Sequence, residues 1–295
     1  MLVIRPRAPY MITPHLRQFS LRGEPTPCLY DEVSRTCARL VTLGDGTRVG
    51  FEATVVSEGW DPLVRVRVLV GSPEAVVGVV KHVLNVGYEY PDTSLLVEAC
   101  PGLRVVVEEY PGLRPALNPS MWESLVKAVI NQQIPTRLAL RITSRLVECL
   151  GERVAVGGKA LYDFPSPEAV LGAGVERLRG LGLSRRKAEY VISVAEAIVK
   201  QGYDLEGVGE LPPQEAVEEL RKFRGVGPWT AKLAYMAYTG NLNLLLPEDL
   251  SVSRGLRLAQ CREELLGKVT DYAGLISYLA ATLYEHTPRR KGADT

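Results

Sequence analysis

The sequence lacks the cysteine patterns that mark disulfide-rich or redox proteins. Its five cysteines form no CxxC pair, and an odd, scattered set in a chain of 295 residues does not predict a disulfide framework. We therefore expect free thiols. The cysteines are Cys28, Cys37, Cys100, Cys149 and Cys261.

Patterns for metal binding are missing as well. The three histidines, His15, His82 and His286, lie too far apart for a helical zinc motif. The cysteine spacing also excludes a four-cysteine iron-sulfur loop near the C-terminus. We predict no metal and no cofactor.

Long apolar runs are absent. No run reaches the roughly 18 residues of a membrane-spanning helix, and the opening MLVIRPRAPY lacks the apolar stretch of a signal peptide. We expect a cytoplasmic monomer with no membrane partner. Charge of one sign is lacking too: 35 basic and 34 acidic side chains give a net charge of +1, so bulk charge does not indicate a nucleic-acid partner.

The first part of the chain has the pattern of a small antiparallel sheet. Residues 28–70 contain alternating apolar segments around the turn Gly44-Asp45-Gly46. Ser72, Pro73 and Glu74 then supply an N-cap, a first-turn proline and an early acid for a helix to about Asn85. We predict an N-terminal α+β domain over residues 1–117.

From Ser120 onward the apolar residues recur with helical spacing. The first such stripe consists of Trp122, Leu125, Val126, Val129, Ile130 and Ile134. We therefore predict two all-α subdomains over residues 118–295, and the fold class of the whole chain is α+β.

The segment LRKFRGVGPWTAKLAYMAY, residues 220–238, predicts a helix-hairpin-helix, spanning about 214–240. Gly225 and Gly227 permit a close approach of a phosphate, and the second helix adds its positive N-terminal end. The hairpin could thus hold one DNA strand without reading its sequence. Thr230 and Lys232, at the start of the second helix, are further candidates for DNA contact. The alternative is a tight turn between two core helices.

The segment LLLPED ends in a carboxylate, Asp249, directly before another helical run. A fixed carboxylate in a poorly hydrated cleft would stabilise the positive charge that develops on a sugar when a glycosidic bond breaks, and it could also orient or deprotonate water. We predict a catalytic loop at about 244–250. The alternative is that Asp249 only caps the following helix.

These features occur together in an order that resembles the helix-hairpin-helix DNA glycosylase superfamily, and most closely the 3-methyladenine DNA glycosylase II family. The resemblance covers most of the chain. The segments that carry it, beyond the hairpin and Asp249, are Pro101-Gly102-Leu103-Arg104, VKAVINQQI from Val126, FPSPEAV from Phe164, LRGLGLSRRKAEYVISVAEAI from Leu178 and LLLPEDL from Leu244. It implies that the sheet domain packs beside two helical subdomains, with a base pocket in the cleft between them.

The resemblance also implies roles for individual residues. Asp249 takes the place of the family's catalytic aspartate, and Trp229 and Tyr284 those of base-stacking aromatics. Gln133 takes the place of the wedge that fills the gap left by a flipped nucleotide. Packing remains the alternative for Trp229, and an ordinary polar helix end remains the alternative for Gln133. A family tyrosine is replaced by Leu233, with Tyr235 nearby.

The expected activity is hydrolysis of the N-glycosidic bond of damaged bases in duplex DNA, with alkylated purines such as 3-methyladenine as substrates, at the nucleoid. Strand-nicking relatives carry a lysine where this chain has Trp229, which cannot form a Schiff base, so we expect a monofunctional enzyme. Two alternatives stay open: a glycosylase for deaminated or oxidised purines, and a non-catalytic hairpin module that docks a protein on DNA.

Overall fold

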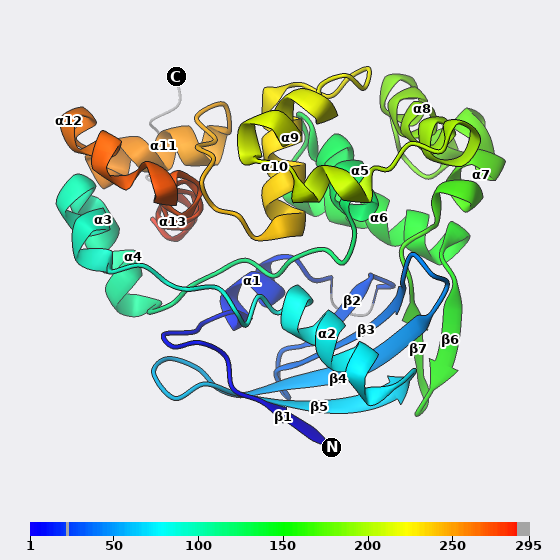
Figure 1. Ribbon diagram of the computed structural model, residues 1–295, viewed down its shortest axis with the longest axis horizontal. Helices are drawn as coiled ribbons and strands as arrows, with labels where there is room; N and C mark the ends of the chain where they lie inside the picture. The colour runs from blue at the N-terminus through cyan, green and yellow to red at the C-terminus, as the bar shows by residue number, and fades with distance from the viewer. Residues whose placement is uncertain (22–23, 288–295) are drawn as a thin grey trace.

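The computed structural model describes residues 1–21 and 24–287. Its N-terminal part is an antiparallel sheet of five strands, in the order β1-β5-β4-β3-β2 (Figure 1). The strands are β1 (Leu2–Ile4), β2 (Cys28–Asp31), β3 (Thr36–Thr42), β4 (Arg48–Ser57) and β5 (Leu63–Val70). The α+β fold class is confirmed, as is the sheet expected over residues 28–70.

One face of the sheet is covered by helix α2 (Pro73–Val83), as Figure 1 shows. Ser72 caps this helix as predicted, because its side chain accepts a hydrogen bond from the Ala75 amide at 3.2 Å. Phe51 and Val80 are fully buried in the apolar cluster between sheet and helix. The short helix α1 (Thr13–Gln18) adds Leu16 to the same cluster.

The opposite face of the sheet meets the helical part of the chain. Leu40 of β3 packs against Leu161 of the hairpin formed by β6 (Arg153–Val156) and β7 (Lys159–Tyr162). On the α2 face of the sheet, where Arg39 of β3 lies opposite Phe51 of β4, Arg39 forms a buried ion pair with Glu123, and both side chains are at most 3% exposed. Two charges that are buried away from water must pair directly with each other. The Arg39–Glu123 ion pair therefore fixes the sheet relative to the helices.

Helices make up most of the rest. They are α3 (Thr93–Ala99), η1 (Pro101–Leu103), α4 (Arg104–Glu109), α5 (Met121–Asn131), α6 (Thr136–Leu150), α7 (Pro167–Gly180), α8 (Arg185–Gln201), η2 (Glu206–Glu210), α9 (Pro213–Leu220), α10 (Pro228–Thr239), α11 (Leu250–Ala259), α12 (Glu263–Leu266), η3 (Gly267–Tyr272) and α13 (Ala273–His286). None of the helices in the described ranges is long and apolar enough to cross a membrane.

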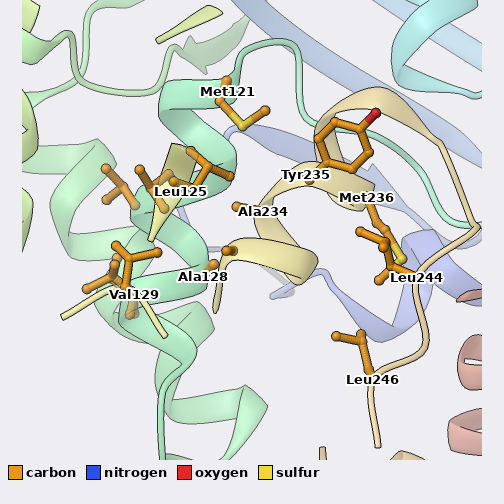
Figure 2. Packing of buried hydrophobic residues seen from close by; sticks show 14 of the residues in the cluster. Met121, Leu125, Ala128, Val129, Ala234, Tyr235, Met236, Leu244 and Leu246 are labelled. Atoms are coloured by element: carbon orange, nitrogen blue, oxygen red, sulfur yellow. The ribbon is translucent and has the colours of Figure 1, made fainter. Parts of the chain in front are cut away.

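Helices α5 and α10 pack closely at the centre of the helical part (Figure 2). Leu125 and Ala128 of α5 and Ala234 of α10 are almost completely buried there. Small residues let the two helices approach each other. Leu246, on the loop after α10, is buried in the same cluster and leads the chain towards Asp249.

The expectation of free thiols is wrong for four of the five cysteines. Cys28 is bonded to Cys37 across β2 and β3, and Cys100 is bonded to Cys261, which is 161 positions away in the chain. Only Cys149 is free, and it is exposed. Sequence spacing could not indicate these pairs, because folding alone brings the partners together.

The Cys100–Cys261 bond lies where α3 and α4 pack against the helices α11–α13. Buried residues of α3 and α4, such as Leu96 and Val106, belong to the large apolar cluster of the helical part. The division into domains at residues 117 and 118 stays a prediction.

Candidate active site

The hairpin lies where the sequence predicts it, with α9 and α10 joined by residues 221–227. Gly225 has φ +81°, and a Cβ there would come within 2.1 Å of the Tyr190 ring, so this position requires glycine. Gly227 differs: its φ of −86° suits any residue, and a Cβ would meet nothing within 4 Å. The space beside Gly227 is therefore open to a ligand at the N-terminus of α10.

Asp249 ends the loop after α10 and is the N-cap of α11. Its Oδ1 accepts hydrogen bonds from the amides of Ser251 and Val252 at 2.9 and 3.2 Å, and from the Ser251 hydroxyl at 2.5 Å. Capping is thus one real role of this residue. Capping uses Oδ1 of the carboxylate and leaves Oδ2 free for another interaction.

Trp229 supplies the partner of that second oxygen. Its indole Nε1 donates a hydrogen bond to Oδ2 of Asp249 at 3.1 Å. Two residues from separate elements, α10 and the loop before α11, are thereby held in fixed relation. The indole is half-buried, and both side chains line the same cavity.

The cavity has a volume of about 340 Å³, which lies within the range typical of small-ligand sites. Its walls are mostly apolar and come from distant parts of the chain: α1, α5, α10, the loop to α11 and α13. The residues that line it include His15, Phe19, Lys127, Trp229, Leu233, Asp249 and Tyr278.

Four of these residues, Lys127 and three with aromatic rings, were not foreseen as part of the site. His15 and Phe19 come from the N-terminal region and stack with ring centroids 4.5 Å apart. The hydroxyl of Tyr278 lies 3.0 Å from His15 Nδ1. No local pattern marks them, since they meet Trp229 and Asp249 only through the packing of α1 and α13 around the cavity.

Lys127 places a cationic group on the cavity wall. Its ammonium donates to Asn118 Oδ1 at 2.6 Å and to Glu123 Oε1 at 3.1 Å. Burial opposes the charge on Glu123, but Arg39 and Lys127 hold the pKa of that carboxyl below its ordinary value. Burial, and then the charge of Lys127, lower the pKa of His15 to about 3, so His15 is neutral at physiological pH.

Tyr284, expected as a pocket aromatic, does not line the cavity. Its hydroxyl accepts a hydrogen bond from Arg254 Nη1 at 2.6 Å, and the Arg254 guanidinium lies over its ring. The cavity-facing residues of α13 are Gly274, Ser277, Tyr278, Ala281, Thr282 and Glu285. These recur at helical spacing, which puts position 284 on a different face. Tyr278 is the aromatic that α13 contributes.

Lys232 was expected to contact phosphate, but its ammonium is engaged within the protein. It donates to the carbonyl of Leu245 at 3.1 Å and to Glu248 Oε1 at 3.0 Å. Lys232 therefore ties α10 to the loop that carries Asp249. Lys232 lies three positions after Trp229, so both residues hold this loop from almost the same side of α10.

Thr230 was also expected on DNA, yet its side chain is only 2% exposed. Its hydroxyl accepts a hydrogen bond from Gln132 Nε2 at 2.9 Å. A phosphate could therefore reach only the backbone of this residue. Tyr235 is equally remote: its hydroxyl donates to the Leu211 carbonyl, while Leu233 lines the cavity.

Gln133 lies in the turn between α5 and α6, with an exposed side chain and a left-handed φ of +53°. Its neighbour Gln132 points the other way, into the hairpin, where Nε2 also donates to the Gly225 carbonyl at 2.9 Å. The two glutamines thus differ in function: one joins the turn to the hairpin, and the other projects from it.

The chain is similar to known DNA repair proteins. Residues 126–266 match the family model of the HhH-GPD superfamily of base excision DNA repair proteins. The DNA-3-methyladenine glycosylase of Bacillus subtilis (strain 168) is 28% identical over 141 residues, which are 48% of this chain and 46% of that protein. DNA-3-methyladenine glycosylase 2 of Escherichia coli (strain K12) is 29% identical over 157 residues, 52% of this chain and 54% of that one.

A solved structure is similar over almost the whole length. The 3-methyladenine DNA-glycosylase from Archaeoglobus fulgidus superposes with a TM-score of 0.81 at 28% identity, covering 97% of this chain and 99% of that chain. The chain spans about half the length of the curated relatives it matches. The likeness therefore includes the N-terminal sheet in the solved structure and only part of each curated relative.

Proposed function

We propose that this chain, a member of the helix-hairpin-helix superfamily of base excision DNA repair proteins, is a monofunctional DNA glycosylase that removes alkylated purines. The observation that carries the proposal is the joint position of Asp249 and Trp229 on one largely apolar cavity beside the hairpin. A hairpin that only docked a protein on DNA would need neither the cavity nor the carboxylate.

Hydrolysis would depend on the carboxylate of Asp249. As the glycosidic bond breaks, positive charge builds on the sugar, and a fixed carboxylate stabilises it in a site with little water. The hydrogen bonds to Ser251, Val252 and Trp229 already fix its orientation before substrate arrives. Oδ2 accepts a hydrogen bond from Trp229 and keeps a second lone pair that can orient the attacking water.

The residue at position 229 supports a monofunctional enzyme. Trp229 occupies the position of the lysine that strand-nicking relatives use, and an indole cannot form a Schiff base. The ammonium of the nearest lysine on α10, Lys232, is engaged by Glu248 and the Leu245 carbonyl. Water is then the expected nucleophile.

The aromatic lining supports alkylated purines as substrates. Methylation at a ring nitrogen makes the base cationic, and an indole face attracts a cation by about 0.5–2 kcal/mol. Trp229, Phe19 and Tyr278 supply rings on the cavity wall. Lys127 does not oppose this preference strongly, because Glu123 compensates its charge.

A set of duplexes that each carry one lesion tests the proposal. We expect single-turnover excision to be fastest for 3-methyladenine, slower for hypoxanthine and slowest for 8-oxoguanine. Fastest release of 8-oxoguanine would refute the alkylated-base assignment while leaving the glycosylase in place. Binding to all duplexes without release of any base would favour the docking module.

A further inference from the structure

The turn between α5 and α6 is fastened by a lysine from a third helix. Lys187 of α8 donates hydrogen bonds from Nζ to the carbonyls of Ile130 and Gln132, at 2.8 and 2.6 Å. These carbonyls lie at the C-terminal end of α5, where helical carbonyls lack partners and a positive charge is stabilising. Burial lowers the pKa of the Lys187 ammonium.

Lys187 lies at the unfavourable end of its own helix for a positive charge. It stands in the first turn of α8, where the helix dipole disfavours a cation. Its positive charge is therefore more favourable at the C-terminal end of α5 than at the N-terminal end of α8. The neighbouring Arg185 instead reaches Glu176 at the surface, with a side chain that is 57% exposed. The basic run Arg185-Arg186-Lys187 therefore includes one residue with an internal task.

The same turn is fastened to the hairpin from its other side. Gln132 Nε2 donates to both the Gly225 carbonyl and the Thr230 hydroxyl, each at 2.9 Å. Gln133, the next residue, has a left-handed backbone that costs energy for a residue with a Cβ. Such a conformation persists only where surrounding contacts enforce it.

We infer that Lys187 and Gln132 are positioning residues that hold Gln133 rigidly against the hairpin, so that the wedge and the phosphate-binding turn engage DNA as one unit. The inference rests on the proposed function, in which Gln133 fills the gap left by the flipped base. A rigid wedge loses little conformational freedom when it enters the duplex. A loose one would lose more, and flipping would become less favourable.

The test compares one lesion in two duplexes, opposite its normal partner and opposite an abasic site. The abasic strand has no orphaned base, so the lesion is unpaired and needs little help from a wedge. We expect Lys187→Met to lower single-turnover excision about tenfold opposite the normal partner, the order expected for losing hydrogen bonds from a charged donor. Opposite the abasic site the loss should be below about threefold. Lys187→Arg should restore activity, since a guanidinium can donate to both carbonyls.

Two further variants serve as checks. Gln132→Leu, which removes the contact to the hairpin, should show the same dependence on the opposite strand. Lys200→Met is the matched control, since this lysine lies on the same helix but pairs only with Glu196 at the surface. It should leave both rates unchanged. Thermal unfolding midpoints identify any variant that fails to fold. If one of Lys187→Met and Gln132→Leu does not fold, the excision rates of the other test the inference.

A second measurement separates the inference from the proposed function. With 2-aminopurine beside the lesion, its fluorescence reports unstacking without excision, so it can be read in an Asp249→Asn background. Adding Lys187→Met should reduce the fluorescence rise at saturating protein only opposite the normal partner. Equal losses of excision in the two duplexes, or an unchanged fluorescence rise, would overturn the inference. A wild-type chain that unstacks but never excises would refute the glycosylase proposal alone.

Discussion

The replacement Asp249→Asn separates the capping role of this residue from its proposed catalytic role. Asparagine is about as good an N-cap as aspartate, and its amide oxygen can keep the bonds from the Ser251 and Val252 amides. Its NH2 group then faces the Trp229 Nε1–H, so two donors meet where a donor and an acceptor met before. We expect the free energy of unfolding to fall by only about 1 kcal/mol.

Catalysis should suffer far more than stability. The variant loses the full negative charge near the sugar, and removal of one charge-stabilising group costs about 100- to 1,000-fold in rate, or about 2.7–4 kcal/mol. The assay is single-turnover release of an alkylated purine from a duplex, with binding followed by fluorescence anisotropy on a duplex that contains an abasic analogue. Binding should stay within about threefold of wild type, because the hairpin contacts need no charge at this position.

Glu248→Gln is the matched control, since it removes the neighbouring carboxylate, which pairs with Lys232 rather than with Trp229. We expect it to retain excision within about tenfold, the scale of one weakened ion-paired contact at a half-exposed site. Excision by Asp249→Asn within about threefold of wild type would refute the reasoning. So would equal losses in the two variants.

Three other outcomes follow from the same geometry. Trp229→Phe keeps a ring but loses the hydrogen-bond donor to Asp249, so it should slow excision of every lesion about tenfold. Trp229→Leu should additionally reduce excision of cationic lesions relative to hypoxanthine, by the cation-π contribution of about 0.5–2 kcal/mol. An unchanged ratio of the two excision rates would contradict this. Borohydride during turnover should trap no protein-DNA adduct, whereas an adduct would implicate Lys232 or another amine. Burial lowers the pKa of His15 to about 3, so between about pH 6.5 and 3 the imidazole is protonated in the unfolded chain but neutral in the folded one. The folded state is therefore progressively destabilised as the pH falls through this range. Unfolding midpoints of wild type should decline more than those of His15→Gln there, and parallel curves would exclude this role.

Local signals in the sequence predict much of this fold. The alternation in residues 28–70 indicates the sheet, Ser72 marks the start of α2, and Gly225 with Gly227 locates the hairpin. Each of these features depends on neighbours within a few positions. The loop ending in Asp249 is also recognisable, because its proline and its capping carboxylate are both local.

The other parts of the site depend on contacts between distant segments. His15 and Tyr278 are 263 positions apart, and only the packing of α1 beside α13 brings them into the cavity. No local pattern shows which face of α13 Tyr284 occupies; in the structure it contacts Arg254, while Tyr278 lines the cavity. Lys232 and Lys187 look like surface charges in the sequence because nothing near them reveals the carbonyls they bind.

The bond between Cys100 and Cys261 has a consequence for how the chain can be cut. It closes a covalent ring that contains α5, the hairpin and Asp249. A protease that cleaves one peptide bond inside this ring leaves both fragments attached, so the nicked protein migrates as one piece until a reductant is added. Each half of the site also stays at high effective concentration relative to the other. A chain nicked once in a surface loop would therefore keep α10 and the Asp249 loop assembled.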